Sequence, residues 1–292
     1  MTPHEEPIRG YNFLGLAPEE TEYTPARVVV LPVAYDATVS YRSGTKYGPA
    51  AIIAASREVE TYDPMSRREI AEIGIHTAVE LEAIAEGPAH MVDAVEREVA
   101  LHLRNGKYCV MLGGEHSITT GAVRAHKAKY PKLSVLQFDA HADMRDSYQG
   151  SKWSHACVMR RVRELVPAVS VGIRNASADC HQSLEAGKCP VFWGKDCVGR
   201  SDWHDAALKA LSDDVYLTID LDGFDPSIMP SVGTPEPGGF LWQETLEFLH
   251  LLFARKHIVG FDVVELSPIP ALHHPDFLAA KLVAEMIRMI RF

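Results

Sequence analysis

Three side chains of the types that bind metal ions alternate after a short apolar segment near the middle of the chain. The segment LSVLQF (133–138) runs directly into Asp139, His141 and Asp143. In an extended chain, side chains two residues apart point the same way, so these three groups should converge on one point. Two carboxylates and an imidazole at one buried point repel one another unless a cation lies between them. The spacing therefore predicts a divalent metal site.

Other apolar segments also end in acidic or histidine side chains. These are His116 after the segment 107–113, Asp220 and Asp222 at the end of 214–222, and Glu265 near the end of 257–266. In open α/β sheets, ligands gather at the carboxyl ends of the strands. Six nitrogen and oxygen ligands from three strand ends are more than one catalytic metal ion needs. Glu265 is expected at the same edge of the sheet. Two ions roughly 3.5–4 Å apart, bridged by carboxylates and a water, would use all six ligands.

The elements that must position these residues follow from the hydrophobic pattern. Continuous Val- and Ile-rich segments are typical of strands covered on both faces, and they occur at 27–33, 107–113, 133–139, 168–173, 214–222 and 257–266. Segments with helical periodicity lie between or after them, at 91–105, 119–130, 242–256 and 276–290. This alternation predicts a parallel sheet with helices on both faces. With no repeat or linker, we expect one domain over residues 1–292.

Composition excludes several classes of protein. The chain has 292 residues and a formal net charge of −10, which gives no electrostatic support for nucleic-acid binding. No apolar segment reaches transmembrane length, and the first residues lack the layout of a signal peptide. The five cysteines form no CxxC pair, so we expect free thiols in a reducing compartment. A cytoplasmic protein without membrane or nucleic-acid partners is expected.

The ligand set also indicates which metal ion binds. It is rich in carboxylates and contains no thiolate, which favours Mn²⁺ over structural zinc. Water that bridges two such ions loses a proton near neutral pH and becomes a nucleophile. The residues therefore predict metal-assisted hydrolysis.

The motifs carry a family resemblance over nearly the whole chain. In order along the sequence they are SYRSGTKYGPAAI (40–52), GGEHS (113–117), DAHAD (139–143), SHA (154–156), IDLDGFDP (219–226) and VVELSP (263–268). This series resembles the ureohydrolases, the family of arginase and agmatinase. The resemblance implies a three-layer αβα fold with a central parallel sheet, two manganese ions and a homotrimer or homohexamer.

The resemblance also implies a role for each site residue. One metal ion would be bound by His116, Asp139, Asp143 and Asp220, and the other by His141, Asp139, Asp220 and Asp222. Asp143 is thereby counted among the catalytic residues. His155 would carry a proton to the leaving amine and contact the substrate, and Glu265 would accept hydrogen bonds from the guanidinium group. Glu115 is expected to orient His116 or a neighbour.

The sequence departs from the arginase pattern in two places. Ala156 follows His155 where arginases carry Gly, and their asparagine-bearing loop is not recognisable in DSYQGSKWS (146–154). A substrate carboxylate would then meet an acidic mouth without a partner. A small cationic substrate is therefore predicted, namely agmatine, cleaved to putrescine and urea in polyamine biosynthesis.

Several alternatives to agmatine cleavage stay open at this point. N1-aminopropylagmatine and other guanidino compounds, including guanidino acids, could be the substrate of the same chemistry. A deacetylase of the related zinc-dependent fold uses one metal ion, and a pseudoenzyme would use the site only for binding. The complete ligand set, together with His155 and Glu265, favours a ureohydrolase over both.

Overall fold

A computed structural model describes residues 10–64 and 67–292. Its main element is an eight-stranded sheet in the order β4-β1-β5-β10-β9-β6-β7-β8, in which every pairing is parallel. The strands are β1 (Val28–Val33), β4 (Ile75–Thr77), β5 (Tyr108–Gly113), β6 (Ser134–Phe138), β7 (Ala168–Ile173), β8 (Val191–Trp193), β9 (Asp214–Asp220) and β10 (His257–Val264). The predicted parallel sheet is confirmed.

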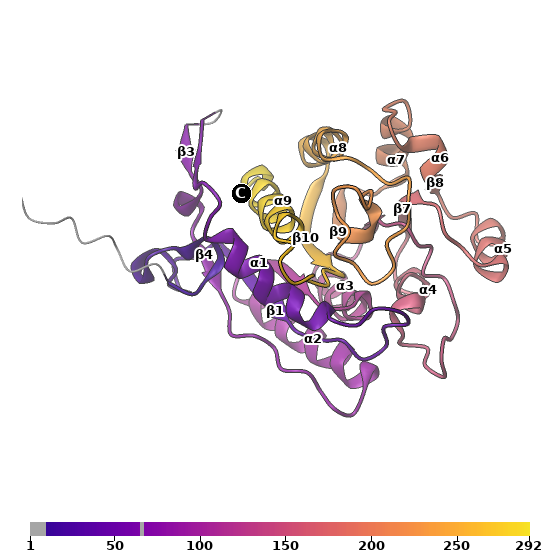
Figure 1. The fold of residues 1–292 in the computed structure, drawn as a ribbon, viewed down its shortest axis with the longest axis horizontal. Helices are drawn as coiled ribbons and strands as arrows, with labels where there is room; N and C mark the ends of the chain where they lie inside the picture. Colours follow the sequence, from indigo (N-terminus) through magenta and orange to yellow (C-terminus); the bar gives the residue numbers. More distant parts are fainter. Residues whose placement is uncertain (1–9, 65–66) are drawn as a thin grey trace, which may run out of the picture.

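Helices cover both faces of this sheet (Figure 1). One face packs against α1 (Gly48–Ser56), α7 (His204–Ala210), α8 (Trp242–Arg255) and α9 (His274–Met289). The opposite face packs against α2 (Pro88–Arg104), α3 (Thr119–Lys129), α4 (Val158–Arg163) and α5 (Ala178–Ala186). A short helix, α6 (Gly194–Cys197), follows β8. The architecture is the expected three-layer αβα sandwich.

Strand β5 contributes side chains to the apolar clusters on both faces of the sheet. Its side chains alternate, so Val110 and Leu112 join one apolar cluster while Cys109 and Met111 join the other. All four are at most 2% exposed. Since both faces are covered, the strand reads as one continuous apolar segment. Each fully buried aliphatic side chain contributes roughly 1.5–3 kcal/mol to folding.

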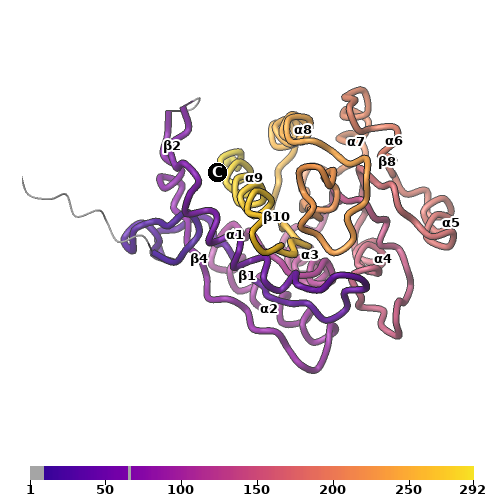
Figure 2. The backbone as a smooth tube through the Cα atoms, in the orientation of Figure 1, coloured from indigo at the N-terminus to yellow at the C-terminus, as the bar shows by residue number. Residues whose placement is uncertain are grey.

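All six strands predicted from the sequence are present, with ends shifted by up to two residues. The sequence pattern did not show β4 and β8, which are three-residue strands at the two edges of the sheet. A separate antiparallel pair, β2 (Tyr62–Asp63) and β3 (Arg68–Glu69), projects from the body of the molecule (Figure 2). Short strands leave too few residues for a periodic pattern.

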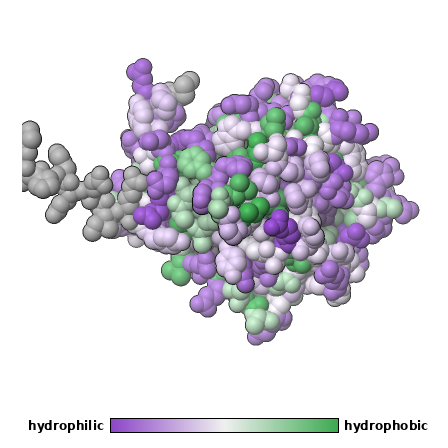
Figure 3. All heavy atoms as spheres, in the orientation of Figure 1, coloured by the Kyte–Doolittle hydropathy of each residue, from purple (hydrophilic) through white to green (hydrophobic). Residues whose placement is uncertain are grey.

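The surface is mixed in polarity. On the face drawn in Figure 3, hydrophobic side chains are interspersed with hydrophilic ones. Among the residues that the structure describes, no helix has the length and apolar character needed to cross a membrane.

The strands that end in ligand-type residues are neighbours in the sheet. Strands β5, β10, β9 and β6 occupy its four central positions. Because all are parallel, their carboxyl ends meet at one edge, as the sequence predicts. The topology therefore brings together side chains that are up to 149 residues apart in the sequence, such as His116 and Glu265.

Gly114 allows the backbones of three segments to meet at this edge. Its N–H donates to the Val33 carbonyl at 2.9 Å, and its carbonyl accepts from the Glu265 N–H at 2.8 Å. A Cβ atom at this position would lie 1.9 Å from the Tyr35 carbonyl oxygen. Only a residue without a side chain fits, which explains the second glycine of the GGEHS motif.

Gly114→Ala should therefore destabilise the fold, because the clash is with backbone rather than with a flexible side chain. We expect a loss of at least about 3 kcal/mol in the free energy of unfolding, measured by chemical denaturation. Gly106→Ala is the matched control, since Gly106 has a φ of +74° but open space around the added Cβ. The control should lose only about 1–2 kcal/mol. Equal losses in the two variants would refute the close-approach argument.

Candidate metal centre

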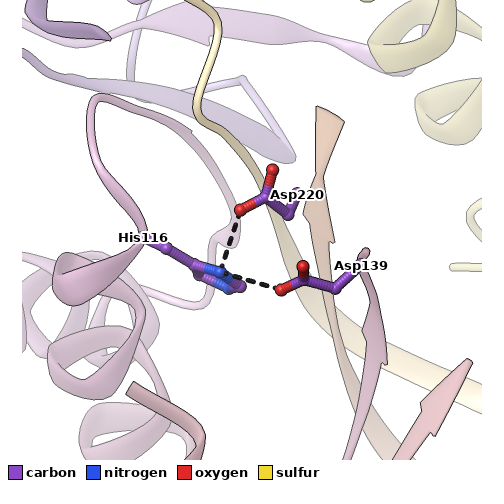
Figure 4. A group of neighbouring side chains, drawn as sticks. All are labelled: His116, Asp139 and Asp220. Carbon is purple, nitrogen blue, oxygen red and sulfur yellow. Dashed lines mark ion pairs between the residues drawn. The ribbon is translucent and has the colours of Figure 1, made fainter. Parts of the chain in front are cut away.

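His116 lies at the centre of a carboxylate cluster. It begins the 3-10 turn His116–Ile118 directly after β5 and is fully buried. Its Nδ1 atom lies 3.3 Å from Asp139, 3.3 Å from Asp143 and 3.2 Å from Asp220. Figure 4 shows the imidazole pointing at Asp139 and Asp220, which come from the ends of β6 and β9. The three strand ends thus converge, as the sequence predicts.

The other ring nitrogen of His116 is held by a hydrogen bond to a threonine. Its Nε2 atom lies 2.9 Å from the Thr218 hydroxyl, and that hydroxyl donates to Asp262 at 2.6 Å. Since the only hydroxyl hydrogen goes to Asp262, Thr218 accepts from Nε2–H, which leaves Nδ1 to face the three carboxylates. Nδ1 has no hydrogen-bond partner among the described residues. Three buried carboxylates around this nitrogen require a positive charge, which is either a proton on Nδ1 or a divalent metal ion in its place, and the donor set fits the metal ion.

A second cluster shares one member with the first. His141 Nδ1 lies 2.8 Å from Asp222, and Asp139 accepts a hydrogen bond of 2.6 Å from the His141 N–H. Ligand atoms of Asp139, His141 and Asp222 approach closely enough to hold one ion, and those of His116, Asp139 and Asp220 do so as well. Asp139 therefore occupies the position of a carboxylate that serves both clusters.

The backbone that delivers these ligands differs from the extended strand expected from the sequence. Strand β6 ends at Phe138, and Asp143 has a φ of 49°, in the left-handed region. Its carbonyl accepts hydrogen bonds from the N–H groups of Met159 and Arg160, which hold this turn in place. Asp222 lies in a 3-10 turn whose start is capped by Asp220 at 2.9 Å. The side chains converge because of these turns rather than through simple strand alternation.

Burial disfavours the charged forms of two candidate ligand carboxylates, Asp139 and Asp220. Burial, reinforced by Asp222 and Asp143, raises the pKa of Asp139 to about 7. Burial also raises the pKa of Asp220 well above its usual range. Burial opposes the charge on His141, but the neighbouring Asp222, Asp139 and Asp143 together outweigh it and raise the pKa of His141 to about 11. Without a metal ion the site thus holds protons, and a bound cation would replace them.

Glu265 lies next to the cluster without belonging to it. It follows β10 with a φ of +70°, and one carboxylate oxygen accepts a hydrogen bond of 2.6 Å from the His116 N–H. The side chain is 7% exposed and lines a pocket. Burial raises its pKa well above the usual range, so a cationic partner would favour its ionised form. This position suits a carboxylate that accepts hydrogen bonds from a guanidinium group.

The pocket brings together most of the residues singled out from the sequence. The predicted residues that line it are His141, Asp143, His155, Asp220, Asp222 and Glu265. The fully buried His116 and Asp139 do not line it. His155 begins the 3-10 turn His155–Cys157, and its backbone N–H donates to the Thr38 hydroxyl at 2.9 Å. Candidate metal ligands, the His155 imidazole and a buried acid therefore meet in one pocket.

The pocket wall also carries a cation that the sequence analysis did not place there. Arg145 lines the pocket, and its guanidinium lies over the Tyr148 ring at 4.9 Å. The expectation that a substrate carboxylate would meet only acidic groups at the mouth is therefore incomplete. The sequence could not show that Arg145 lines the pocket, because the direction of a loop side chain follows from tertiary contacts.

One other group that shapes the site, the Asp262 carboxylate, was missed, and Glu115 contacts a neighbour of His116, as expected. Asp262 is fully buried and accepts from Thr119, Tyr216 and Thr218. An acid within the apolar segment 257–266 was the available signal, because an acid there requires partners. Glu115 contacts Ser117, the neighbour of His116, together with the loop around Thr38. Asp225, by contrast, caps its own turn by accepting from the Ser227 N–H.

Known proteins are similar to this chain in sequence. The arginase family matches residues 26–288. An N(1)-aminopropylagmatine ureohydrolase from Synechocystis sp. is 41% identical over 275 residues, covering 91% of this chain and 90% of that protein. An agmatinase from Pyrococcus horikoshii is 33% identical, covering 90% of this chain and 92% of that protein.

Solved structures agree with the sequence matches. The agmatine ureohydrolase of Thermoplasma volcanium has a TM-score of 0.84 and 34% identity, with 92% of this chain and 91% of that chain covered. Proclavaminate amidino hydrolase from Streptomyces clavuligerus has a TM-score of 0.86 and 27% identity, with coverages of 95% and 96%. Together with the carboxylate–histidine centre at the sheet edge, these matches show that the chain belongs to the arginase family and is a ureohydrolase, a hydrolase of guanidino C–N bonds.

Proposed function

We propose that this ureohydrolase cleaves the guanidino group of a cationic, agmatine-type substrate. N1-aminopropylagmatine is the first candidate for this substrate, and agmatine is the second. One observation carries the proposal for the chemistry. Both ligand clusters, His155 and Glu265 belong to or border a single pocket. For the substrate, the support is similarity, because identity reaches 41% with N(1)-aminopropylagmatine ureohydrolases and 33% with an agmatinase. Agmatine, which the sequence favours, is kept as the second candidate.

In the proposed reaction, water and a guanidine give urea and an amine. When bound, a pair of divalent ions supplies the Lewis acidity that makes water nucleophilic near neutral pH. Glu265 accepts hydrogen bonds from the guanidinium and orients its carbon toward the metal centre. The new C–O bond forms at this carbon, and the C–N bond to the alkyl chain breaks. His155 donates a proton to the leaving nitrogen, which departs as a neutral amine.

The position of Asp139 favours two metal ions over one. A single-metal deacetylase has no use for a carboxylate that belongs to two ligand clusters, as Asp139 does. A scaffold protein without activity has no use for His155 and Glu265 beside those clusters. Manganese, cytoplasmic location and a homotrimeric or homohexameric assembly belong to this proposal as expectations from the ligand chemistry and the family.

Metal content should respond differently to changes at Asp139 and Asp222. Asp139 belongs to both clusters and Asp222 to one. We expect about two ions per chain in fully active protein, about one in Asp222→Asn, and less than that in Asp139→Asn. Elemental analysis after Mn²⁺ reconstitution and dialysis makes the measurement. One ion per chain at full wild-type activity would rule out the two-metal proposal.

A urea-release screen tests the substrate. We expect kcat/KM for N1-aminopropylagmatine and agmatine to exceed that for arginine by at least about 100-fold, which corresponds to roughly 2.7 kcal/mol of transition-state binding. Guanidinobutyrate belongs in the screen, because Arg145 could bind its carboxylate. If arginine or guanidinobutyrate is hydrolysed as well as agmatine, then the cationic-tail proposal is wrong while the ureohydrolase chemistry stands.

Glu265→Gln should impair catalysis without emptying the metal centre. A glutamine can still accept from the His116 N–H, but its amide then faces the guanidinium with donors instead of an acceptor. We expect kcat/KM to fall about 10–100-fold for every guanidino substrate, with unchanged metal content. Glu236→Gln is the control, since Glu236 accepts from Asn175 beside the pocket. Loss of metal in Glu265→Gln would place this residue among the ligands instead.

A further inference from the structure

One side of the pocket is formed by a loop that a buried carboxylate holds in place. Val39 and Ser40 line the pocket. Just before them, the N–H groups of Ala37 and Thr38 donate to one oxygen of Glu115 at 2.7 and 2.6 Å. Glu115 is fully buried, and its other oxygen accepts from the hydroxyls of Thr38 at 2.7 Å and Ser117 at 2.5 Å. All four contacts are donors, so this carboxylate acts only as an acceptor.

The Thr38 hydroxyl has three polar partners and one hydrogen. It lies 2.7 Å from Glu115, accepts from the His155 backbone N–H at 2.9 Å, and lies 3.3 Å from His155 Nδ1. A hydroxyl offers one donor and two lone pairs. The carboxylate is the closer and stronger acceptor, so it takes the hydrogen. Both lone pairs then face His155, and Nδ1 must carry a hydrogen to complete the set.

This arrangement determines which nitrogen of His155 faces the reaction. With Nδ1 protonated, the neutral imidazole keeps its lone pair on Nε2. Nε2 lies 3.4 Å from the hydroxyl of Ser40, which lines the pocket. The hydroxyl of Ser154 also lies 3.4 Å from Nδ1, farther than that of Thr38. Nε2 is therefore the atom that can take up a proton and release it toward the pocket.

We propose that Thr38, oriented by Glu115, is a positioning residue that fixes the Nδ1–H tautomer of His155 and presents Nε2 to the leaving amine. This inference rests on the proposed role of His155. In the step, Nε2 takes a proton from solvent water and then passes it to the alkyl nitrogen as the C–N bond breaks, and the bonding electron pair stays on that nitrogen. His155 returns to the same Nδ1–H tautomer at the end of each turnover.

Glu115→Gln gives an isosteric test, because an amide has only one acceptor oxygen. That oxygen should turn toward the two backbone N–H groups of Ala37 and Thr38, which cannot act as acceptors. The new NH₂ group then donates to the hydroxyls of Thr38 and Ser117. The Thr38 hydrogen is released and can be donated to His155 Nδ1. The variant should therefore switch His155 to the Nε2–H tautomer while the loop keeps its place.

Neutron diffraction of deuterated, metal-loaded crystals at about pH 9, where an ordinary imidazole is neutral, reads the tautomer directly. In the wild type we expect a deuteron on Nδ1 and none on Nε2 of His155. Thr38→Ser should keep this pattern, because the hydroxyl is retained. Glu115→Gln should place the deuteron on Nε2. A wild-type deuteron on Nε2, or an unchanged tautomer in Glu115→Gln, overturns the inference.

Kinetics provide the second measurement. Thr38→Val should lower kcat about 10–100-fold with KM within about threefold, whereas Thr38→Ser should stay within about threefold of wild type in both. Equal losses in Val and Ser variants would show a role in loop packing only. The neutron result does not depend on activity. If no guanidine yields urea, the proposed function fails alone; if urea is released but the tautomer is wrong, this inference fails alone.

Discussion

The structure depends on negative charge that is buried at the central edge of the sheet. Asp139, Asp220 and Asp222 are at most 4% exposed, and they surround His116 and His141. Desolvated carboxylates at such short range destabilise a fold unless cations and hydrogen-bond donors offset them. Two imidazoles and several backbone N–H groups supply part of this compensation. Protons or a bound cation must supply the remainder, so we expect folding and metal binding to be linked at this edge.

Holding these charges together requires unfavourable backbone conformations. Asp143 and Glu265 both have positive φ, which costs roughly 1–3 kcal/mol for a residue with a side chain. Each is held by neighbouring chain, since the Asp143 carbonyl accepts two N–H groups and the Glu265 N–H donates to Gly114. At Asp143 and Glu265 the strain lies where a carboxylate must turn from the sheet toward the pocket. Rigid central strands therefore support the strained residues.

Much of the fold and the clustering of the candidate ligands could be predicted, because both depend on local pattern. Continuous apolar segments identified β5, β6, β9 and β10, and parallel strands necessarily bring His116, Asp139, Asp220 and Glu265 to one edge. Tertiary features were out of reach. Thr38 and Glu115 are 77 residues apart, and no periodicity connects them. Arg145 could point to solvent or pocket with the same neighbours in sequence, and the edge strands β4 and β8 are too short to show a period.

His116, the proposed metal ligand, and His155, the proposed proton carrier, have the same kind of hydrogen-bond partners on opposite ring nitrogens. In each case a buried carboxylate takes the hydrogen of a threonine hydroxyl, so the hydroxyl can only accept from the imidazole. Thr218 and Asp262 act on Nε2 of His116 and leave Nδ1 free to face the carboxylates. Thr38 and Glu115 act on Nδ1 of His155 and leave Nε2 free to face the pocket. A metal ligand needs a nitrogen that stays deprotonated, whereas a proton carrier needs a nitrogen that is protonated and deprotonated in each turnover. The difference between them arises from what each free nitrogen faces: three buried carboxylates at His116, and a serine hydroxyl beside the open pocket at His155.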